Sequence, residues 1–236
     1  MAVHAPMRRH DFAWLDADVA SWLGAAQVDA DGEDAVDFVD WWVRRGYPLV
    51  VARQHAVPID HVRLGTTRPA PQRHARVALV VPRRVVGRVE PPPPIDAVID
   101  AAPPGWRATM RSLASLCAAT AVAARVYGSL ALQRASGAAY LADDSDLDVQ
   151  FDLGAASDLA ALLEGLRATD GATPRIDGEI RHGAWAVAWR EVLGARQRGA
   201  ATPVLAKGDA CARLLRLEEF LAGFAAVEGA ASSTGG

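Results

Sequence analysis

Apolar residues recur along the chain in runs whose spacing predicts the secondary structure. In the first third, FVDWWVRR (Phe38–Arg45) has a helical pattern that ends at Gly46. Apolar runs bounded by Pro and Gly follow it, and they predict strands at Pro48–Arg53, His61–Thr67 and Arg76–Pro82. A helix and several strands within roughly 80 residues predict a small α+β module.

The second half of the chain alternates more regularly between helical and strand patterns. Helical patterns cover Trp106–Ala124, the LALQRA segment after Ser129, and Ala155–Ala168. Strand patterns lie at Ala124–Ser129, Ser145–Leu153, Pro174–His182 and Pro203–Lys207. WAVAWREVL (Trp185–Leu193) fits either type, and Asp209 predicts the N-cap of a last helix ending near Gly223. This order predicts a mixed sheet with helices on one face.

A proline-rich segment, GRVEPPPPIDAVIDAAPPGW, separates these two parts. Its four consecutive prolines and second proline pair interrupt helix and sheet alike, so we expect a semi-rigid polyproline spacer. The predicted fold is α+β, with an N-terminal α+β module over residues 8–86 and a linker over 87–105. A second domain, with a mixed sheet and helices, follows over residues 106–225.

Composition and charge narrow the classes of protein to consider. The 236 residues are 51% hydrophobic and 22% charged, which is typical of a globular protein. A net charge of −3 gives no reason to expect nucleic acid or membrane as a partner. No apolar run approaches the ~20 residues of a membrane helix, and MAVHAPMRRHDFAWLD lacks the apolar segment of a secretory signal. Cys117 and Cys211 lie among Ala and Leu, so we expect both to be buried in a cytoplasmic protein.

The strand pattern SDLDVQFDL raises the question of function. Its apolar positions Leu147, Val149 and Phe151 alternate with Asp146, Asp148, Gln150 and Asp152. On a strand, Asp146 and Asp148 share a face with Cα atoms about 6.5 Å apart. Carboxylates so close repel each other unless a cation stands between them, and Mg²⁺ is the natural one. The alternative is a solvated acidic face, but aspartate is a poor strand former, which favours the metal site.

Two further features indicate binding of phosphate. Gly128-Ser129 stands where an apolar strand gives way to a helix, and helix N-terminal N–H groups together with a hydroxyl predict an anion site. An ordinary helix cap is the alternative. Lys207, at the end of PVLAK, is a second candidate for binding phosphate, or else a side chain that reaches solvent from a strand end.

The combination resembles the nucleotidyltransferase superfamily that includes DNA polymerase β and the kanamycin nucleotidyltransferases. Its signature is an apolar residue with Gly-Ser, then a strand carrying Asp-x-Asp. Tyr127-Gly128-Ser129 and Asp146-Leu147-Asp148-Val149 match it. The resemblance implies a polymerase-β-like domain in which carboxylates hold divalent metals, and it implies attack on the α-phosphorus of a triphosphate with release of pyrophosphate.

The superfamily places a third carboxylate on a later strand, and PRIDGEIRH offers Asp177 and Glu179. Both would share a strand face; Asp177 follows an apolar residue and is the first choice. A hairpin turn at Asp177-Gly178 is the alternative. We therefore predict Asp146, Asp148 and Asp177 as catalytic residues and as ligands of Mg²⁺, or of Mn²⁺ in its place.

The whole chain resembles the phosphoribosyl-dephospho-CoA transferase family, the malonate decarboxylase holo-[acyl-carrier-protein] synthases. The matching stretches are RRHDFAWLD, VYGSLALQRASGAAYLADDSDLDVQF, RIDGEIRHGAWAVAWREVL and PVLAK, in that order over most of residues 8–220. The resemblance implies 2'-(5''-triphosphoribosyl)-3'-dephospho-CoA as donor. It also implies a serine of the malonate decarboxylase acyl carrier protein as acceptor, with pyrophosphate released.

Two other functions fit the same residues. One is an ATP-dependent nucleotidyltransferase acting on another protein or a small molecule; the other is a catalytically inactive binding module. The N-terminal module is also locally basic, through Arg63, Arg68, Arg73, Arg76, Arg83, Arg84 and Arg88. These arginines could dock an acidic carrier protein or the CoA phosphates, or form an ordinary solvated face.

Overall fold

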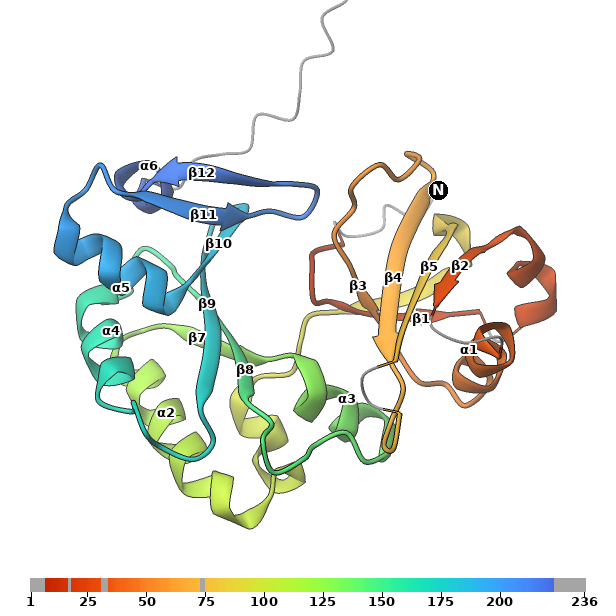
Figure 1. Ribbon diagram of the computed structural model, residues 1–236, viewed down its shortest axis with the longest axis horizontal. Helices are drawn as coiled ribbons and strands as arrows, with labels where there is room; N and C mark the ends of the chain where they lie inside the picture. The colour runs from red at the N-terminus through yellow and green to blue at the C-terminus, as the bar shows by residue number, and fades with distance from the viewer. Residues whose placement is uncertain (1–6, 17, 31–33, 73–74, 223–236) are drawn as a thin grey trace, which may run out of the picture.

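The computed structural model describes residues 7–16, 18–30, 34–72 and 75–222. These residues form two sheets of six strands each, with helices packed around them (Figure 1). One sheet belongs to each half of the chain, so the predicted α+β class with two parts is confirmed.

The first sheet is antiparallel throughout and has the order β2-β5-β4-β3-β1-β6. Its strands are β1 (Phe12–Leu15), β2 (Gln27–Ala30), β3 (Leu49–Val51), β4 (His61–Thr67), β5 (Arg76–Pro82) and β6 (Val86–Glu90). Helix α1 (Ala35–Arg44) buries Val39 and Trp42 in the same core as Val62 and Leu64 of β4. The alternate positions of β4 are half-exposed, so the other face of this sheet stays accessible.

The second sheet is mixed and has the order β12-β11-β10-β9-β8-β7, with a parallel pairing between β8 and β9. Its strands are β7 (Ala123–Val126), β8 (Leu147–Asp152), β9 (Ile176–His182), β10 (Trp185–Ala188), β11 (Pro203–Lys207) and β12 (Ala212–Arg216). The helices are α2 (Arg107–Ala119), α3 (Gly128–Ser136), α4 (Leu159–Arg167), α5 (Trp189–Arg198) and α6 (Leu217–Leu221). Figure 1 places α2, α4 and α5 on the side of this sheet that faces away from the first module.

The proline-rich segment is part of the fold, which corrects the expectation of a semi-rigid polyproline spacer. Its first residues belong to β6, which pairs with β1 at the edge of the first sheet and ends at Glu90, directly before the four prolines. A 3-10 helix (Ile95–Ala101) follows and buries Ile95 and Val98 in the core. Pro94 also bridges to Arg125 of β7, so this segment is fixed to both sheets.

Two local predictions for the second half need correction, and one that was left open is decided. Asp209 does not cap a helix: residues 212–216 form β12, which pairs along β11, and the last helix is only α6. Cys211 is exposed, whereas Cys117 is buried as predicted. The ambiguous WAVAWREVL segment contains both types, because β10 ends at Ala188 and α5 begins at Trp189.

The two modules pack closely against each other. Buried apolar side chains from both form one connected core. The Tyr140 hydroxyl donates a hydrogen bond to the Thr67 carbonyl (2.8 Å), and the backbone N–H of Gln54 donates to the Asp209 carbonyl (2.7 Å). Among the helices that the structure describes, none is long and apolar enough to cross a membrane.

Candidate active site

The parallel pairing of β8 with β9 decides which carboxylates lie together. Asp148 stands opposite Asp177, and Gln150 stands opposite Glu179. Opposed residues of neighbouring strands lie on the same face, so Asp177 is the carboxylate beside Asp148. Asp177-Gly178 lies inside β9, so the alternative of a hairpin turn there is wrong. Gly178 permits the close pairing, because a Cβ at this position would lie 2.6 Å from the Val149 carbonyl oxygen.

The carboxyl group of Asp148 has a strongly shifted pKa. Burial, followed by the charges of Asp177 and Asp146, raises the pKa of Asp148 to about 7. The ionised form is therefore disfavoured by the protein alone. A cation beside Asp148 and Asp177 would reverse this, because opposite charge favours the ionised form.

Asp146 is bound by an arginine in this structure. The Arg175 Nε donates a 2.8 Å hydrogen bond to Asp146 Oδ1, and Arg175 Nη2 donates to Asp146 Oδ2. The Arg175 side chain is 62% exposed. Within the described part of the chain, no three His, Cys, Asp or Glu side chains are grouped so that they could hold a metal ion. The structure thus places Asp148 opposite Asp177. Asp146 instead forms an ion pair with Arg175 through two hydrogen bonds.

Gly128 and Ser129 begin helix α3 directly against Asp148. The Tyr127 amide donates a 3.1 Å hydrogen bond to the Asp148 carbonyl, and this bond fixes the end of β7 beside β8. Gly128 has φ of +67°, and a Cβ there would lie 2.0 Å from Asp148 Oδ2. Only glycine therefore allows the carboxylate to approach the first turn of α3, where free N–H groups favour an anion.

Gly128→Ala is expected to lower the free energy of unfolding by roughly 2 kcal/mol. The alanine would be strained in the left-handed backbone conformation, and its methyl group would also overlap the Asp148 carboxylate. Transfer activity should fall as well, since the Asp148 carboxylate has to move. Gly137→Ala is the matched control: Gly137 has φ of +71°, but nothing lies within 4 Å of its added Cβ. Chemical denaturation of both variants should separate steric conflict from backbone strain. Equal losses in the two would show that contact with Asp148 is unimportant.

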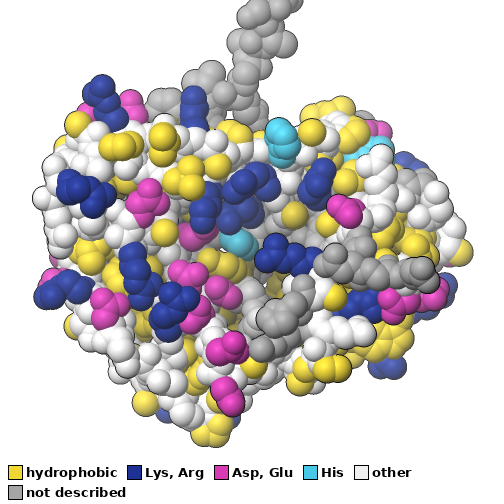
Figure 2. Space-filling view, in the orientation of Figure 1, with side chains coloured by type: hydrophobic (Ala, Val, Ile, Leu, Met, Phe, Trp, Pro, Cys, Tyr) yellow, Lys and Arg dark blue, Asp and Glu magenta, His cyan; other side chains and the backbone are white. Residues whose placement is uncertain are grey.

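A cleft of about 520 Å³ opens where the two modules meet. One wall is formed by Tyr127, Gly128, Ser129 and Asp148, and the other comes from strands β3 to β5 of the first module. Figure 2 shows basic and acidic side chains gathered around the hollow on this face. The predicted phosphate-binding dipeptide and the central aspartate therefore line one cavity.

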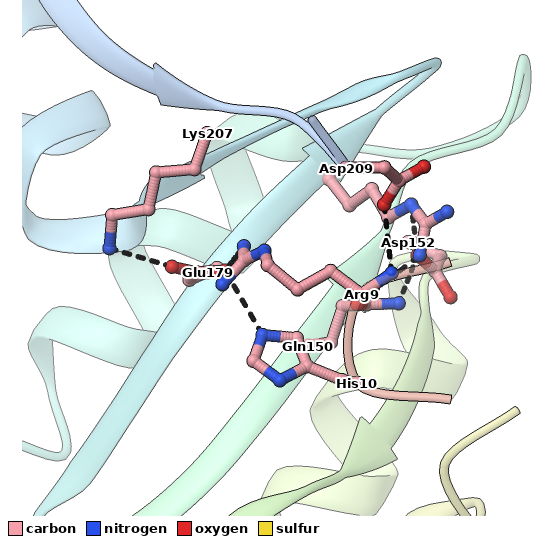
Figure 3. A network of polar contacts seen from close by, with 8 residues as sticks. Arg9, His10, Gln150, Asp152, Glu179, Lys207 and Asp209 are labelled. Carbon is pink, nitrogen blue, oxygen red and sulfur yellow. Dashed lines mark hydrogen bonds and ion pairs between the residues drawn. The ribbon is translucent and has the colours of Figure 1, made fainter. Parts of the chain in front are cut away.

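Glu179 has a different role from the aspartates, although it shares their face. Its buried carboxylate accepts hydrogen bonds from Arg9 Nη2 and from Lys207 Nζ (2.8 Å), and His10 Nε2 lies 3.7 Å from it (Figure 3). Burial acts to raise the pKa of Glu179, but His10, Arg9 and Lys207 hold that pKa well below its ordinary value. Lys207, predicted to bind phosphate, is thus paired with Glu179 in this structure.

The residues that sequence reasoning missed come from the opposite end of the chain. Arg9 and His10 precede β1, yet both line the cleft and reach the second sheet. The Arg9 amide donates to Asp209 Oδ1 (2.8 Å), and the His10 ring stacks on Tyr127 with centroids 4.0 Å apart. Burial lowers the pKa of His10, which opposes its protonation. The only sequence signal was the RRHD stretch itself, which carries no spacing that indicates its partner.

The arginines of the N-terminal module do not form one basic surface. Arg68 is buried and makes two 2.8 Å hydrogen bonds to Asp34, and Arg88 pairs with Glu90 (3.2 Å). Arg83 donates to the Ile59 carbonyl, whereas Arg76 lines the cleft. Arg73 lies outside the described residues. The local excess of positive charge is therefore divided among several separate sites.

Comparison with known families accounts for nearly the whole chain. Residues 94–218 match the model of the C-terminal domain of phosphoribosyl-dephospho-CoA transferase MdcG, and residues 8–92 match its N-terminal domain. The chain belongs to the phosphoribosyl-dephospho-CoA transferase family. It is accordingly a transferase, and the family boundary falls within the four consecutive prolines.

Individual relatives carry the same name. A phosphoribosyl-dephospho-CoA transferase of Bradyrhizobium diazoefficiens is 34% identical over 224 residues, which cover 92% of this chain and 94% of the relative. The enzyme of that name from Xanthomonas campestris pv. campestris (strain 8004) is 32% identical over 215 residues, covering 90% and 96%. No solved structure matches the chain. The similarity to the family thus extends over both modules.

Proposed function

We propose that this protein transfers the phosphoribosyl-dephospho-CoA group of 2'-(5''-triphosphoribosyl)-3'-dephospho-CoA to a serine of the malonate decarboxylase acyl carrier protein. Pyrophosphate is the second product, and the reaction takes place in the cytoplasm. The observation that carries the proposal is the cleft lined by Asp148 and the first turn of α3, together with Asp177, which stands opposite Asp148 on the neighbouring strand. Family membership supports the transferred group, and the site supports phosphoryl chemistry.

A divalent cation, Mg²⁺ or Mn²⁺, fits the carboxylates of this site. Asp148 and Asp177 supply oxygen ligands from adjacent strands, and the raised pKa of Asp148 is what an uncompensated pair of this kind produces. Asp146 would complete the set in exchange for its ion pair with Arg175. When bound, the cation would neutralise negative charge that develops on the phosphates during transfer.

The chain's own residues bind the phosphates and accept the proton of the nucleophile. The N–H groups of the first turn of α3 and the Ser129 hydroxyl bind phosphate oxygens, aided by the positive end of the helix dipole. Asp177, exposed at the cleft-side face of β9, accepts the proton of the attacking serine. That serine oxygen bonds to the α-phosphorus as the bond to pyrophosphate breaks, which leaves a phosphodiester.

The test is the intact mass of the apo carrier protein after incubation with this protein, Mg²⁺ and the triphosphate donor. We expect a gain equal to one phosphoribosyl-dephospho-CoA unit, with pyrophosphate released in equal amount. A carrier whose acceptor serine is replaced by alanine is the control and should gain nothing. ATP is run in parallel: a gain of AMP would support the ATP-dependent alternative. No gain with either donor would support the inactive binding module.

A further inference from the structure

The wall of the cleft that belongs to the first module is an open face of its sheet. Val50 of β3 pairs with Gly65 of β4, and Thr67 of β4 pairs with Arg76 of β5, so these four lie on one face. The opposite face of the same strands is buried in the core. Gly65 and the neighbouring Ala52 also line the cleft, so much of this wall is apolar and low in relief.

Two arginines stand on this wall without acidic partners. Arg53 and Arg76 are exposed side chains that line the cleft, and neither forms a hydrogen bond or ion pair with the residues that the structure describes. Other arginines of the module are paired, such as Arg44 with Asp40 and Arg68 with Asp34. Free guanidinium groups beside a cavity favour a ligand with phosphate oxygens, because the planar fork matches them.

We infer that this wall binds the dephospho-CoA portion of the donor, with Arg53 and Arg76 holding its diphosphate. The inference rests on the proposed function, which places the reacting triphosphate on the opposite wall at α3. The donor is too long to remain there: beyond its triphosphoribosyl group it carries an adenosine, a diphosphate and a pantetheine arm. A flat apolar strip formed by Gly65 and Ala52 suits the adenine, and the arginines complement the two diphosphate charges.

This arrangement assigns selectivity to the first module. Chemistry at the α-phosphorus needs only the second module's wall, which treats any ribose triphosphate alike. The first module's wall would then distinguish the dephospho-CoA conjugate from ATP, which has no second phosphate chain to reach the arginines. Arg53 and Arg76 are specificity-determining residues in this scheme, because they contact the donor away from the reacting atoms.

The test uses 3'-dephospho-CoA as the probe and measures its binding to the full chain by calorimetry, without the carrier protein. The variants are Arg53→Gln, Arg76→Gln, the double variant, and Arg53→Lys with Arg76→Lys. Each single loss is expected to weaken binding about 10-fold and the double loss roughly 100-fold, while the lysine pair keeps part of the affinity. Arg84→Gln, exposed on the same module away from the cleft lining, is the matched control.

The outcomes separate this inference from the proposed function. If dephospho-CoA binds in an arginine-dependent way but the carrier gains no mass, the wall is correctly assigned and the reaction is not. If transfer proceeds and the double variant binds dephospho-CoA as tightly as the wild type, the wall is wrongly assigned. A higher KM for the carrier with an unchanged KM for the donor would also overturn it, because the arginines would then contact the acceptor. Unchanged melting temperatures should accompany every variant, since neither side chain has a hydrogen-bond or ion-pair partner among the residues that the structure describes.

Discussion

Replacing Asp148 by asparagine is expected to slow transfer to the carrier protein by at least about 10³-fold, the rate equivalent of several kcal/mol of electrostatic stabilisation. Asp148 lies between the neighbouring aspartate strand and the start of α3. It faces Asp177 across the strand pair, and its carboxylate lies against Gly128 at the start of α3. An amide keeps the size of this group but supplies neither the charge nor the second ligand oxygen. Initial rates of mass gain by the carrier measure the effect.

The loss of activity should not come from unfolding. Burial and the neighbouring Asp177 and Asp146 raise the pKa of Asp148 to about 7, so its charge is unfavourable in the folded protein without metal. At pH 8 the metal-free variant is therefore expected to melt at the same temperature as the wild type or higher. Mn²⁺ binding, followed by electron paramagnetic resonance, should weaken in the variant. Asp143→Asn, at an exposed aspartate of the preceding loop, is the matched control and should keep full activity. Transfer within tenfold of the wild-type rate in the Asp148 variant would show that the catalytic assignment is wrong.

The fold could be predicted where a strand or helix carries its own pattern. β4 and β5 were found as apolar runs bounded by Pro and Gly, and β8 was found from the alternation of its apolar residues with aspartates, although Gln150 is buried too. β1 and β2 have four residues each, too few for a period to stand out. β6 and β12 exist because a partner strand supplies their hydrogen bonds, and this tertiary contribution outweighs the prolines near β6 and the expected cap at Asp209.

In the candidate site, too, residues with a local sequence pattern could be predicted, and residues brought together only by the tertiary structure could not. Gly128, Ser129 and Asp148 could be grouped because each stands in a recognisable local pattern, Gly-Ser at a helix start and Asp-x-Asp in an apolar strand, and the two patterns in this order resemble the nucleotidyltransferase signature. Asp177 was preferred over Glu179 only because it follows an apolar residue, and its place opposite Asp148 depends on the register of β9 on β8, which no local pattern specifies. Arg9 meets Glu179 across a separation of 170 residues, and a single sequence carries no signal for such a contact.

Glu179→Gln is expected to lower the free energy of unfolding by about 3 kcal/mol, the lower end of the range for breaking a buried ion pair from one side. The Glu179 side chain is only 7% exposed and is the shared partner of Arg9 and Lys207. Its neutral replacement would leave both cations close together with no carboxylate between them. Because Arg9 belongs to the first module and Lys207 to the second, the change should also loosen the contact between the modules. Chemical denaturation at pH 7 measures the free energy.

The pH dependence of the difference in unfolding free energy between wild type and Glu179→Gln shows whether the charge of Glu179 causes it. Glu179 has a pKa held below the ordinary 4.5, so its ionised form is stabilised by folding. The contribution is complete above the unfolded pKa and is lost as the pH falls through the lower folded value. The gap between wild type and variant should therefore be largest near neutral pH and shrink below about pH 4.5. Glu164→Gln, in an exposed ion pair with Arg167, is the control and should leave stability unchanged. A gap that stays constant down to acid pH would mean that Glu179 stabilises the protein by its shape, and that its charge does not join the two modules.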